Sequence, residues 1–284
     1  MTEFSVTTLA TEGVIAPKDL MPKMAAWGYD GIELWGGDLP GAAHVTWFRN
    51  DSVRIADIYR GDRATDQELE VLADLKATAE SAGLAIPMIS PYFDFVAGAQ
   101  RWEESLIVGQ RYVQYAHALG CRLIRTMSGG SGSARGNVPS VAMTDAEWDA
   151  CISGLKALTR LSGAEDVIFA IETHSKRPED SIESVLRQIN RVSSDNLRVL
   201  LQPNQFIPTI PGMTTERMLE ALYPYTVHLH ERSGMKDSPV GWASLLADLD
   251  SLGYDGYLSI ERASEEPRLQ TLEHEVQWLK SIIH

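Results

Sequence analysis

Short apolar runs alternate with longer segments of helical spacing along the whole chain, and this alternation limits the fold more than any other feature. Eight runs are predicted as strands, at residues 4–9, 31–35, 85–90, 122–127, 167–172, 198–202, 226–230 and 257–261. The clearest helices between them are predicted at residues 66–82, 101–119, 145–161, 181–192, 241–252 and 269–282. Continuous apolar strands separated by helices indicate parallel strands that helices cover.

Eight strand–helix units in a chain of 284 residues predict a (β/α)8 barrel that forms one domain over residues 1–284. The phrase "GYDG" begins at Gly28 and again at Gly253, each time before an apolar run. It is typical of a helix stopped by glycine and followed by a turn into a buried strand. The competing fold is an open, doubly wound sheet. It is disfavoured because the glycine cluster "SGGSGSARG" at residues 128–136 lacks both phosphate-binding glycine patterns.

Composition narrows the class of function. The formal net charge of −14 disfavours nucleic acid as a partner, because phosphate binding depends on lysine and arginine. The two cysteines, Cys121 and Cys151, are too few for a disulfide scaffold. The N-terminal residues lack a basic and apolar leader, and no apolar run is long enough to span a membrane. We therefore expect a cytoplasmic protein with a small-molecule substrate, alone, as a homo-oligomer or with a partner subunit.

Polar side chains follow the predicted strands, at the end of a barrel where chemistry collects. They are Glu33, Trp35, Tyr92, Phe93, Arg125, Glu172, His174, Gln202, Asn204, His228, His230 and Glu261. Taken singly, each has an ordinary explanation. Glu172 fits a structural ion pair, the strand histidines fit satisfied core residues, and Arg262 offers Glu261 a salt bridge.

Three of these side chains form a stronger pattern together. Glu172, His230 and Glu261 end the fifth, seventh and eighth predicted strands, so a closed barrel would bring them to one mouth. Two buried carboxylates are costly unless a cation neutralises them. A divalent ion with carboxylate and imidazole ligands accounts for all three residues and leaves positions open for sugar oxygens.

The chain resembles the xylose isomerase-like TIM-barrel superfamily, the broad sugar phosphate isomerase/epimerase family. The resemblance rests on "GYDGIELWG", "IPMISPYFDF", "GCRLIRTMSGG", "AIETHS", "VHLHE" and "GYDGYLSIE", which together extend over nearly the whole chain. It implies a divalent ion, manganese first and magnesium or cobalt as alternatives, held by Glu172, His230 and Glu261. The family commonly has Asp where this chain has Gln202. A glutamine carbonyl binds a hard cation without charge, so either the ion is held more weakly or the chemistry is metal-free.

The expected reaction follows from such a site. A divalent ion that binds a carbonyl and the neighbouring hydroxyl lowers the pKa of the adjacent C–H and stabilises an enediolate. Glu172 and Glu261 would then remove and return the proton, which gives isomerisation or epimerisation. A lyase or dehydratase would use the same enolate to expel a β-leaving group, and a non-catalytic barrel with a degenerate site is a further alternative. DNA-repair endonucleases of this barrel type are disfavoured by the acidic charge.

Other side chains near the mouth have looser predicted roles. His174 is a candidate acid or hydrogen-bond donor to the substrate, or a residue that supports the ligands. Trp35, Phe93 and Trp47 are candidates for an apolar wall against a sugar ring. Arg125, Arg232, Lys176 and Lys236 are candidates for contact with a phosphate or carboxylate. Residues 36–65 form a long connection, which favours a lid, an interface element or a surface excursion.

Overall fold

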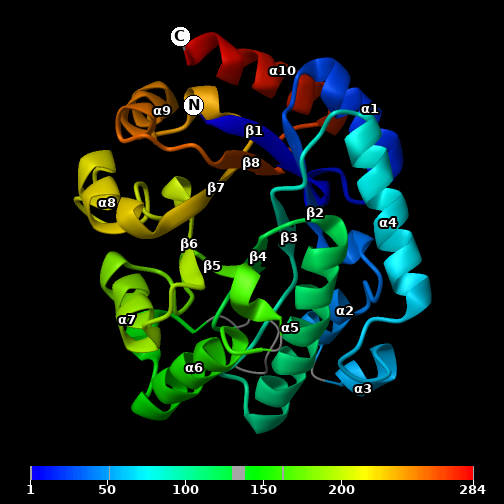
Figure 1. Cartoon of the computed structure of the whole chain (residues 1–284). Helices are drawn as coiled ribbons and strands as arrows, with labels where there is room; N and C mark the ends of the chain where they lie inside the picture. The colour runs from blue at the N-terminus through cyan, green and yellow to red at the C-terminus, as the bar shows by residue number, and fades with distance from the viewer. Residues whose placement is uncertain (1, 51, 130–137, 162, 284) are drawn as a thin grey trace.

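Eight parallel strands close into a barrel in sequence order, and β1 completes the ring by pairing with β8 (Figure 1). This computed structural model describes residues 2–50, 52–129, 138–161 and 163–283. The strands are β1 (Glu3–Thr7), β2 (Gly31–Trp35), β3 (Met88–Ser90), β4 (Leu123–Thr126), β5 (Ile168–Glu172), β6 (Leu197–Leu201), β7 (Thr226–Arg232) and β8 (Tyr257–Arg262). The prediction of a (β/α)8 barrel is confirmed. Residues 130–136 of the glycine cluster lie outside the described residues.

Helices surround the barrel, and α10 packs beside α1 at the point where the ring closes (Figure 1). In the described residues they are α1 (Pro17–Trp27), α2 (His44–Arg49), α3 (Ile55–Ile58), α4 (Asp66–Ser81), α5 (Ala99–Leu119), α6 (Asp145–Leu158), α7 (Ile182–Val192), α8 (Thr215–Leu222), α9 (Trp242–Ser251) and α10 (Arg268–Ile282). None of the described helices is both long and apolar enough to cross a membrane.

The repeated phrase is the joint between a helix and the next strand. Gly28 follows α1 with a φ of 97°, and Gly253 follows α9 with a φ of 80°. Residues with a side chain rarely adopt this left-handed conformation, so glycine ends each helix and turns the chain toward β2 or β8. The same sequence therefore forms the same turn at two places in the barrel.

The long connection between β2 and α4 is tied to the outer face of α5. The carboxylate of Glu104 on α5 accepts hydrogen bonds from Trp47 Nε1 at 2.7 Å and from Arg54 Nε at 2.8 Å. It also accepts one from the backbone N–H of Ile55. These contacts fix α2 and α3 against α5, so this part of the connection is a packed element.

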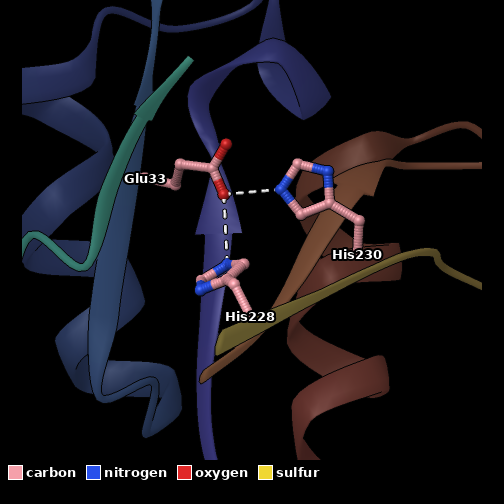
Figure 2. A group of neighbouring side chains, drawn as sticks. All are labelled: Glu33, His228 and His230. Atoms are coloured by element: carbon pink, nitrogen blue, oxygen red, sulfur yellow. Dashed lines mark hydrogen bonds and ion pairs between the residues drawn. The ribbon is translucent and has the colours of Figure 1, made fainter. Parts of the chain in front are cut away.

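The barrel interior has a polar side at β2 and β7 and a small apolar cluster at the inner parts of β3, β5 and β6. Side chains of a strand alternate in direction, so Glu33 of β2 and both His228 and His230 of β7 point into the barrel, where they meet (Figure 2). A small apolar cluster of Met88, Ala170 and Leu200 from β3, β5 and β6 also lies in the interior. The polar side is continuous with the mouth through His230.

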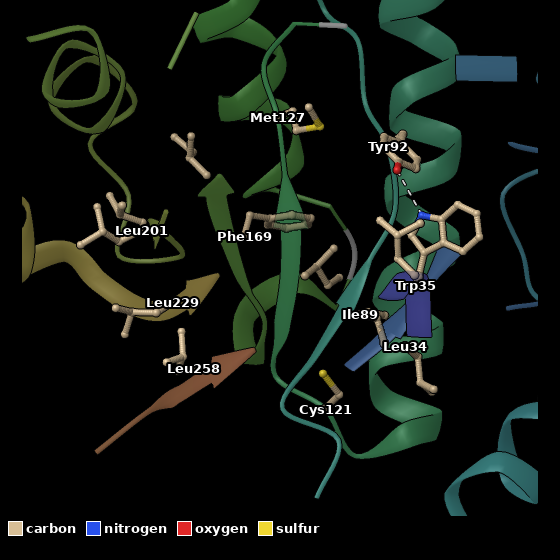
Figure 3. Packing of buried hydrophobic residues seen from close by; sticks show 14 of the residues in the cluster. Leu34, Trp35, Ile89, Tyr92, Cys121, Met127, Phe169, Leu201, Leu229 and Leu258 are labelled. Atoms are coloured by element: carbon tan, nitrogen blue, oxygen red, sulfur yellow. Dashed lines mark hydrogen bonds between the residues drawn. The ribbon is translucent and has the colours of Figure 1, made fainter. Parts of the chain in front are cut away.

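The larger apolar core lies between the barrel and the helices, where the outward-facing residues of the strands pack (Figure 3). Leu34, Phe169, Leu201, Leu229 and Leu258 contribute to it and are fully buried. Burial of a side chain of this size stabilises the fold by about 1.5–3 kcal/mol. The strand sequences "IEL", "HLH" and "LSIE" thus place an apolar residue in this core and a polar one in the barrel at alternate positions.

Candidate metal centre and active site

Four side chains meet at the mouth where the strands end. Glu172 is the last residue of β5, Gln202 follows β6, His230 lies in β7 and Glu261 in β8. All four are buried, and Glu261 is the most accessible at 9% exposure. Ligand atoms of Glu172, His230 and Glu261 lie within 4.8 Å of one another. The structure therefore brings together the residues that the sequence proposed as a metal site.

Several atoms at the centre of this group have no hydrogen-bond partner. Glu172 Oε1 and His230 Nδ1 are 3.4 Å apart without a hydrogen bond, and Gln202 Oε1 also has no donor. Buried polar atoms normally have a partner, so three of them in one place need an explanation. Two ligands at right angles around an ion with bonds of about 2.1 Å are about 3 Å apart. The donor set and its spacing fit a divalent cation.

Gln202 is oriented by the neighbouring carboxylate. Its Nε2 donates to Glu261 Oε2 at 3.2 Å, which leaves its carbonyl oxygen Oε1 for a cation. Glu261 uses one oxygen for this contact and keeps Oε1 for another partner. The amide thus fits the ligand set while contributing no charge to it.

Glu33 fixes the orientation of His230 (Figure 2). His230 Nε2 donates to Glu33 Oε2 at 2.7 Å, so Nδ1 is the nitrogen that faces Glu172. A metal-ligating histidine typically donates its other N–H to a carboxylate in this way. Burial would raise the pKa of Glu33, but the two histidines outweigh it and hold this pKa well below its usual range. Burial alone would lower the pKa of His230, whereas Glu33 and Glu172 raise it to about 10.

A second group of metal-competent side chains lies deeper in the barrel. Ligand atoms of Glu33, His228 and His230 also lie within 4.8 Å of one another. Here the atoms that face one another are already paired, because His228 Nε2 is 2.8 Å from Ser259 Oγ and the second Glu33 oxygen accepts from Ser90. Of this group, His228 Nδ1 lacks a hydrogen-bond partner. We interpret this inner group as hydrogen-bonded support for His230. Glu33 was predicted at the end of a strand without a specific role, although a carboxylate inside the apolar run "GIELW" is a signal for one.

Arg125 of β4 lies beside the two carboxylates of the mouth. Its Nη1 is 3.3 Å from Glu172 Oε2 and 4.0 Å from Glu261 Oε1. Its Nη2 donates to the Pro91 carbonyl at 3.1 Å, and the guanidinium lies 4.6 Å from the ring centre of Tyr92. Burial would raise the pKa of Glu172, but Arg125, followed by His230, outweighs it and lowers this pKa to about 2. Glu172 is therefore held ionised, with one oxygen toward Arg125 and the other toward His230.

The predicted aromatic wall is only partly at the mouth. Trp35 donates from Nε1 to the hydroxyl of Tyr92 at 3.1 Å, so it contacts the ring that packs against Arg125. Phe93 is fully buried and stacks on Phe95 with ring centres 6.3 Å apart. Trp47 is fully buried against α5. Of the three, Trp35 is the one connected to the centre, through Tyr92 and Arg125.

The remaining predicted residues differ in accessibility. His174 is half-buried, and its Nδ1 lies 2.8 Å from the carbonyl of Ser175, which leaves Nε2 for another partner. Arg232, Lys176 and Lys236 are exposed. Among the basic candidates in the described residues, Arg125 is the one in direct contact with the carboxylates.

Comparisons with known proteins agree with this architecture. A family model described as xylose isomerase-like TIM barrel matches residues 21–282. No curated protein matches the chain. A probable 3-DHS dehydratase of Bacillus anthracis involved in petrobactin synthesis is similar in structure, with a TM-score of 0.77, 18% identity and coverage of 98% of this chain and 99% of that one.

Two epimerases are similar to about the same degree. The D-psicose 3-epimerase of Clostridium cellulolyticum has a TM-score of 0.75 and 12% identity, with all of both chains covered. The 3-keto-D-glucoside 4-epimerase of E. coli has a TM-score of 0.74 and 11% identity, with 99% of this chain and 100% of that chain covered. Identities this low establish the shared fold alone.

Proposed function

The chain belongs to the xylose isomerase-like TIM-barrel family, and on that premise we propose that it is a metal-dependent isomerase or epimerase of a keto sugar or related polyol. The observation that carries this proposal is the set of buried ligand atoms on Glu172, Gln202 and His230 that lack a hydrogen-bond partner, next to Glu261. The similarity in fold to two epimerases supports the same class of reaction.

We propose that Glu172, Gln202, His230 and Glu261 hold the divalent ion, with manganese first and magnesium or cobalt as alternatives. When bound, the ion would supply Lewis-acid polarisation of a carbonyl and its neighbouring hydroxyl. Glu33 holds Nδ1 of His230 toward this position, and Gln202 holds Glu261 through its amide N–H. The protein's own contribution is thus a ligand set that is oriented in advance.

The proton is proposed to move between the substrate carbon and the two carboxylates. Glu261 is the more accessible of the pair, whereas Glu172 is paired with Arg125. We therefore assign the first proton abstraction to Glu261. The proton returned to the substrate carbon comes from His174, whose Nε2 has no partner among the described contacts, or from Glu172 after this carboxylate has itself taken up a proton. This order follows from the pairing of Glu172 with a cation, which makes it the weaker base.

A lyase or dehydratase is the second candidate. The similarity to a probable dehydratase, with the TM-score of 0.77 given above, favours it. The same enolate leads to either outcome. If the substrate has a leaving group β to the carbonyl, the enolate expels it; otherwise the carbon next to the carbonyl is protonated again. A non-catalytic barrel is the remaining alternative.

The test is a screen of keto sugars and 3-oxo-glycosides with added Mn²⁺ in deuterated water, followed by NMR. The proposal predicts deuterium at the carbon next to the carbonyl, and loss of a leaving group would identify the lyase. Product without deuterium would rule out the enediolate route. If a Glu261→Gln variant incorporated solvent deuterium into the substrate at the wild-type rate, another group would be the one that abstracts the proton. A protein that retains no Mn²⁺ after desalting would favour the non-catalytic alternative.

The two cysteines bear on the proposed compartment. Cys121 and Cys151 are both free and buried, and burial raises the pKa of the Cys121 thiol to about 12. Both thiols are therefore inert structural residues. This agrees with the cytoplasm, which we propose as the compartment.

A further inference from the structure

Two buried arginines lie at the mouth, each with a donor that has no acceptor. Arg125 is 2% exposed and Arg177, in the connection after β5, is 8% exposed. Arg177 donates from Nη1 to the Gly129 carbonyl at 3.2 Å. The Nε atoms of both residues lack a hydrogen-bond partner. A buried guanidinium with a spare donor is costly unless an acceptor completes it.

The two guanidinium groups are close enough to affect each other. Burial lowers the pKa of Arg177, and the charge of Arg125 adds to this, although Glu172 and Glu179 oppose it. Glu179 accepts from the backbone N–H of Ser128 at 2.6 Å and from its hydroxyl, so this carboxyl is partly occupied elsewhere. Two like charges held together inside a protein favour an anion between or beside them.

The charge of the ligand set leads to the same conclusion. The two carboxylates, Glu172 and Glu261, balance a divalent ion, and the amide of Gln202 adds no charge. Glu33 binds the opposite nitrogen of the His230 ring, so its charge lies behind the ligand. Arg125 therefore gives the side that faces the substrate an excess of positive charge.

We propose that the substrate carries a carboxylate next to its reacting carbonyl, and that Arg125, supported by Arg177, binds this carboxylate. The inference rests on the proposed function for the reacting carbonyl. It narrows the substrate class to keto sugar acids and related keto acids. Arginine suits this role because its planar donors match the two oxygens of a carboxylate.

A carboxylate fits better than a phosphate because of the depth of Arg125. Its Nη1 lies 3.3 Å from a carboxylate oxygen of the ligand set, so a group that reaches it must be within a bond or two of the atoms that bind the ion. The phosphate of a sugar phosphate is usually at the far end of the carbon chain. Arg232, Lys176 and Lys236, the other basic candidates, are exposed and so are not buried beside the ligand set as Arg125 is.

The experiment compares three small ligands that share one hydroxyketone group. Hydroxypyruvate carries a carboxylate on the carbonyl, dihydroxyacetone carries a hydroxymethyl group there, and dihydroxyacetone phosphate carries a phosphate ester. Binding to the full-length protein is measured by calorimetry with Mn²⁺ at saturation. We expect hydroxypyruvate to bind more tightly than dihydroxyacetone by about tenfold to hundredfold, the usual effect of a charge-assisted pair.

A carboxylate can also bind Mn²⁺ directly, so variants are needed to distinguish the contribution of Arg125 from that of the ion. Arg125→Gln should lose about tenfold or more of the preference for hydroxypyruvate while binding Mn²⁺ at least as tightly as wild type. Arg125→Lys keeps the charge and should lose part of the preference for hydroxypyruvate over dihydroxyacetone. It replaces Arg125→Gln in the test if the glutamine variant does not fold. Arg122→Gln, an exposed arginine just before β4 and so at the opposite end of the barrel, is the control and should keep the preference.

The outcomes distinguish this inference from the proposed function. Equal binding of hydroxypyruvate and dihydroxyacetone by wild type, or a preference unchanged in Arg125→Gln, would overturn the carboxylate site. Tightest binding of the phosphate ester would overturn it as well. Failure of wild type to bind Mn²⁺ would count against the metal-dependent function instead. The ligand series would then be repeated without Mn²⁺, where binding of hydroxypyruvate that depends on Arg125 would still support the site.

Discussion

Replacement of Glu33 by glutamine should weaken metal binding although Glu33 is not one of the proposed ligands. Its carboxylate is fully buried and accepts from His230 Nε2 at 2.7 Å. Glutamine has nearly the same shape, and its carbonyl still accepts this hydrogen bond. Glu33→Gln therefore removes the charge and keeps the orientation of His230.

The size of the effect follows from the geometry. A metal ion on Nδ1 would lie about 6.5 Å from the Glu33 carboxylate, across the imidazole ring. Glu33 and Glu172 raise the pKa of His230, so the ring carries an extra proton before the metal binds. A divalent ion that displaces this proton changes the charge on the ring side of Glu33 by one positive unit. At an effective dielectric constant of about 20, the attraction between one positive charge and the Glu33 carboxylate at this distance is about 2.5 kcal/mol. The expected loss in Mn²⁺ affinity is thus about tenfold to hundredfold, which agrees with the usual effect of such outer partners.

The assay is calorimetric titration of Mn²⁺ into the metal-free protein, with the thermal midpoint measured for each variant. Glu104→Gln is the matched control, since Glu104 is also buried but pairs with Trp47 and Arg54 far from the ligand set. It should lower the thermal midpoint and leave Mn²⁺ affinity unchanged. Wild-type affinity in a folded Glu33→Gln protein would refute the role given to Glu33.

Three further predictions concern the ligands and a nearby carboxyl. Gln202→Glu adds a negative charge to the ligand set and should tighten Mn²⁺ binding by about tenfold or more in calorimetry; unchanged or weaker binding would show that this side chain does not face the ion. Glu172→Gln and Glu261→Gln should each lower turnover by about 10² to 10⁴ at saturating Mn²⁺, in assays on the substrate that the screen identifies; near-normal turnover in either would remove that residue from the proton transfer. Burial raises the pKa of Glu179 from 4.5 to about 7. The folded protein therefore holds the proton of Glu179 more tightly than the unfolded chain does. The stabilisation that this gives is complete below about pH 4.5 and is lost as the pH rises through about 7. Glu179→Gln should accordingly flatten the fall in stability between about pH 5 and pH 8 in urea unfolding, and a wild-type slope would show that Glu179 is not responsible.

The fold was predictable because the strand sequences are unambiguous. Each apolar run is bounded by turn residues, and the repeated glycine marks two of the joints. The boundaries were less accurate, since β3 begins at Met88 rather than at residue 85 and α5 begins at Ala99 rather than at residue 101. The long connection after β2 was left open between a lid, an interface element and a surface excursion, because nothing local indicates that Trp47 and Arg54 bind Glu104 on a distant helix.

The candidate site was predictable where a residue ends a strand. Glu172, Gln202, His230 and Glu261 could be placed at one mouth from strand order alone. The partners of Glu33 and Arg125 could not be predicted, because they depend on contacts across the barrel between β2 and β7 and between β4 and β5. Distances of this kind are set by closure of the barrel and leave no mark in the local sequence.

The most direct test of the metal centre is the anomalous diffraction of manganese in crystals grown with Mn²⁺. We predict one peak at the mouth, about 2.0–2.4 Å from oxygens of Glu172, Gln202 and Glu261 and from Nδ1 of His230. A peak between Glu33, His228 and Nε2 of His230 would place the ion in the inner group and contradict the assignment. The lack of any peak in the barrel at saturating Mn²⁺ would contradict the metal centre itself.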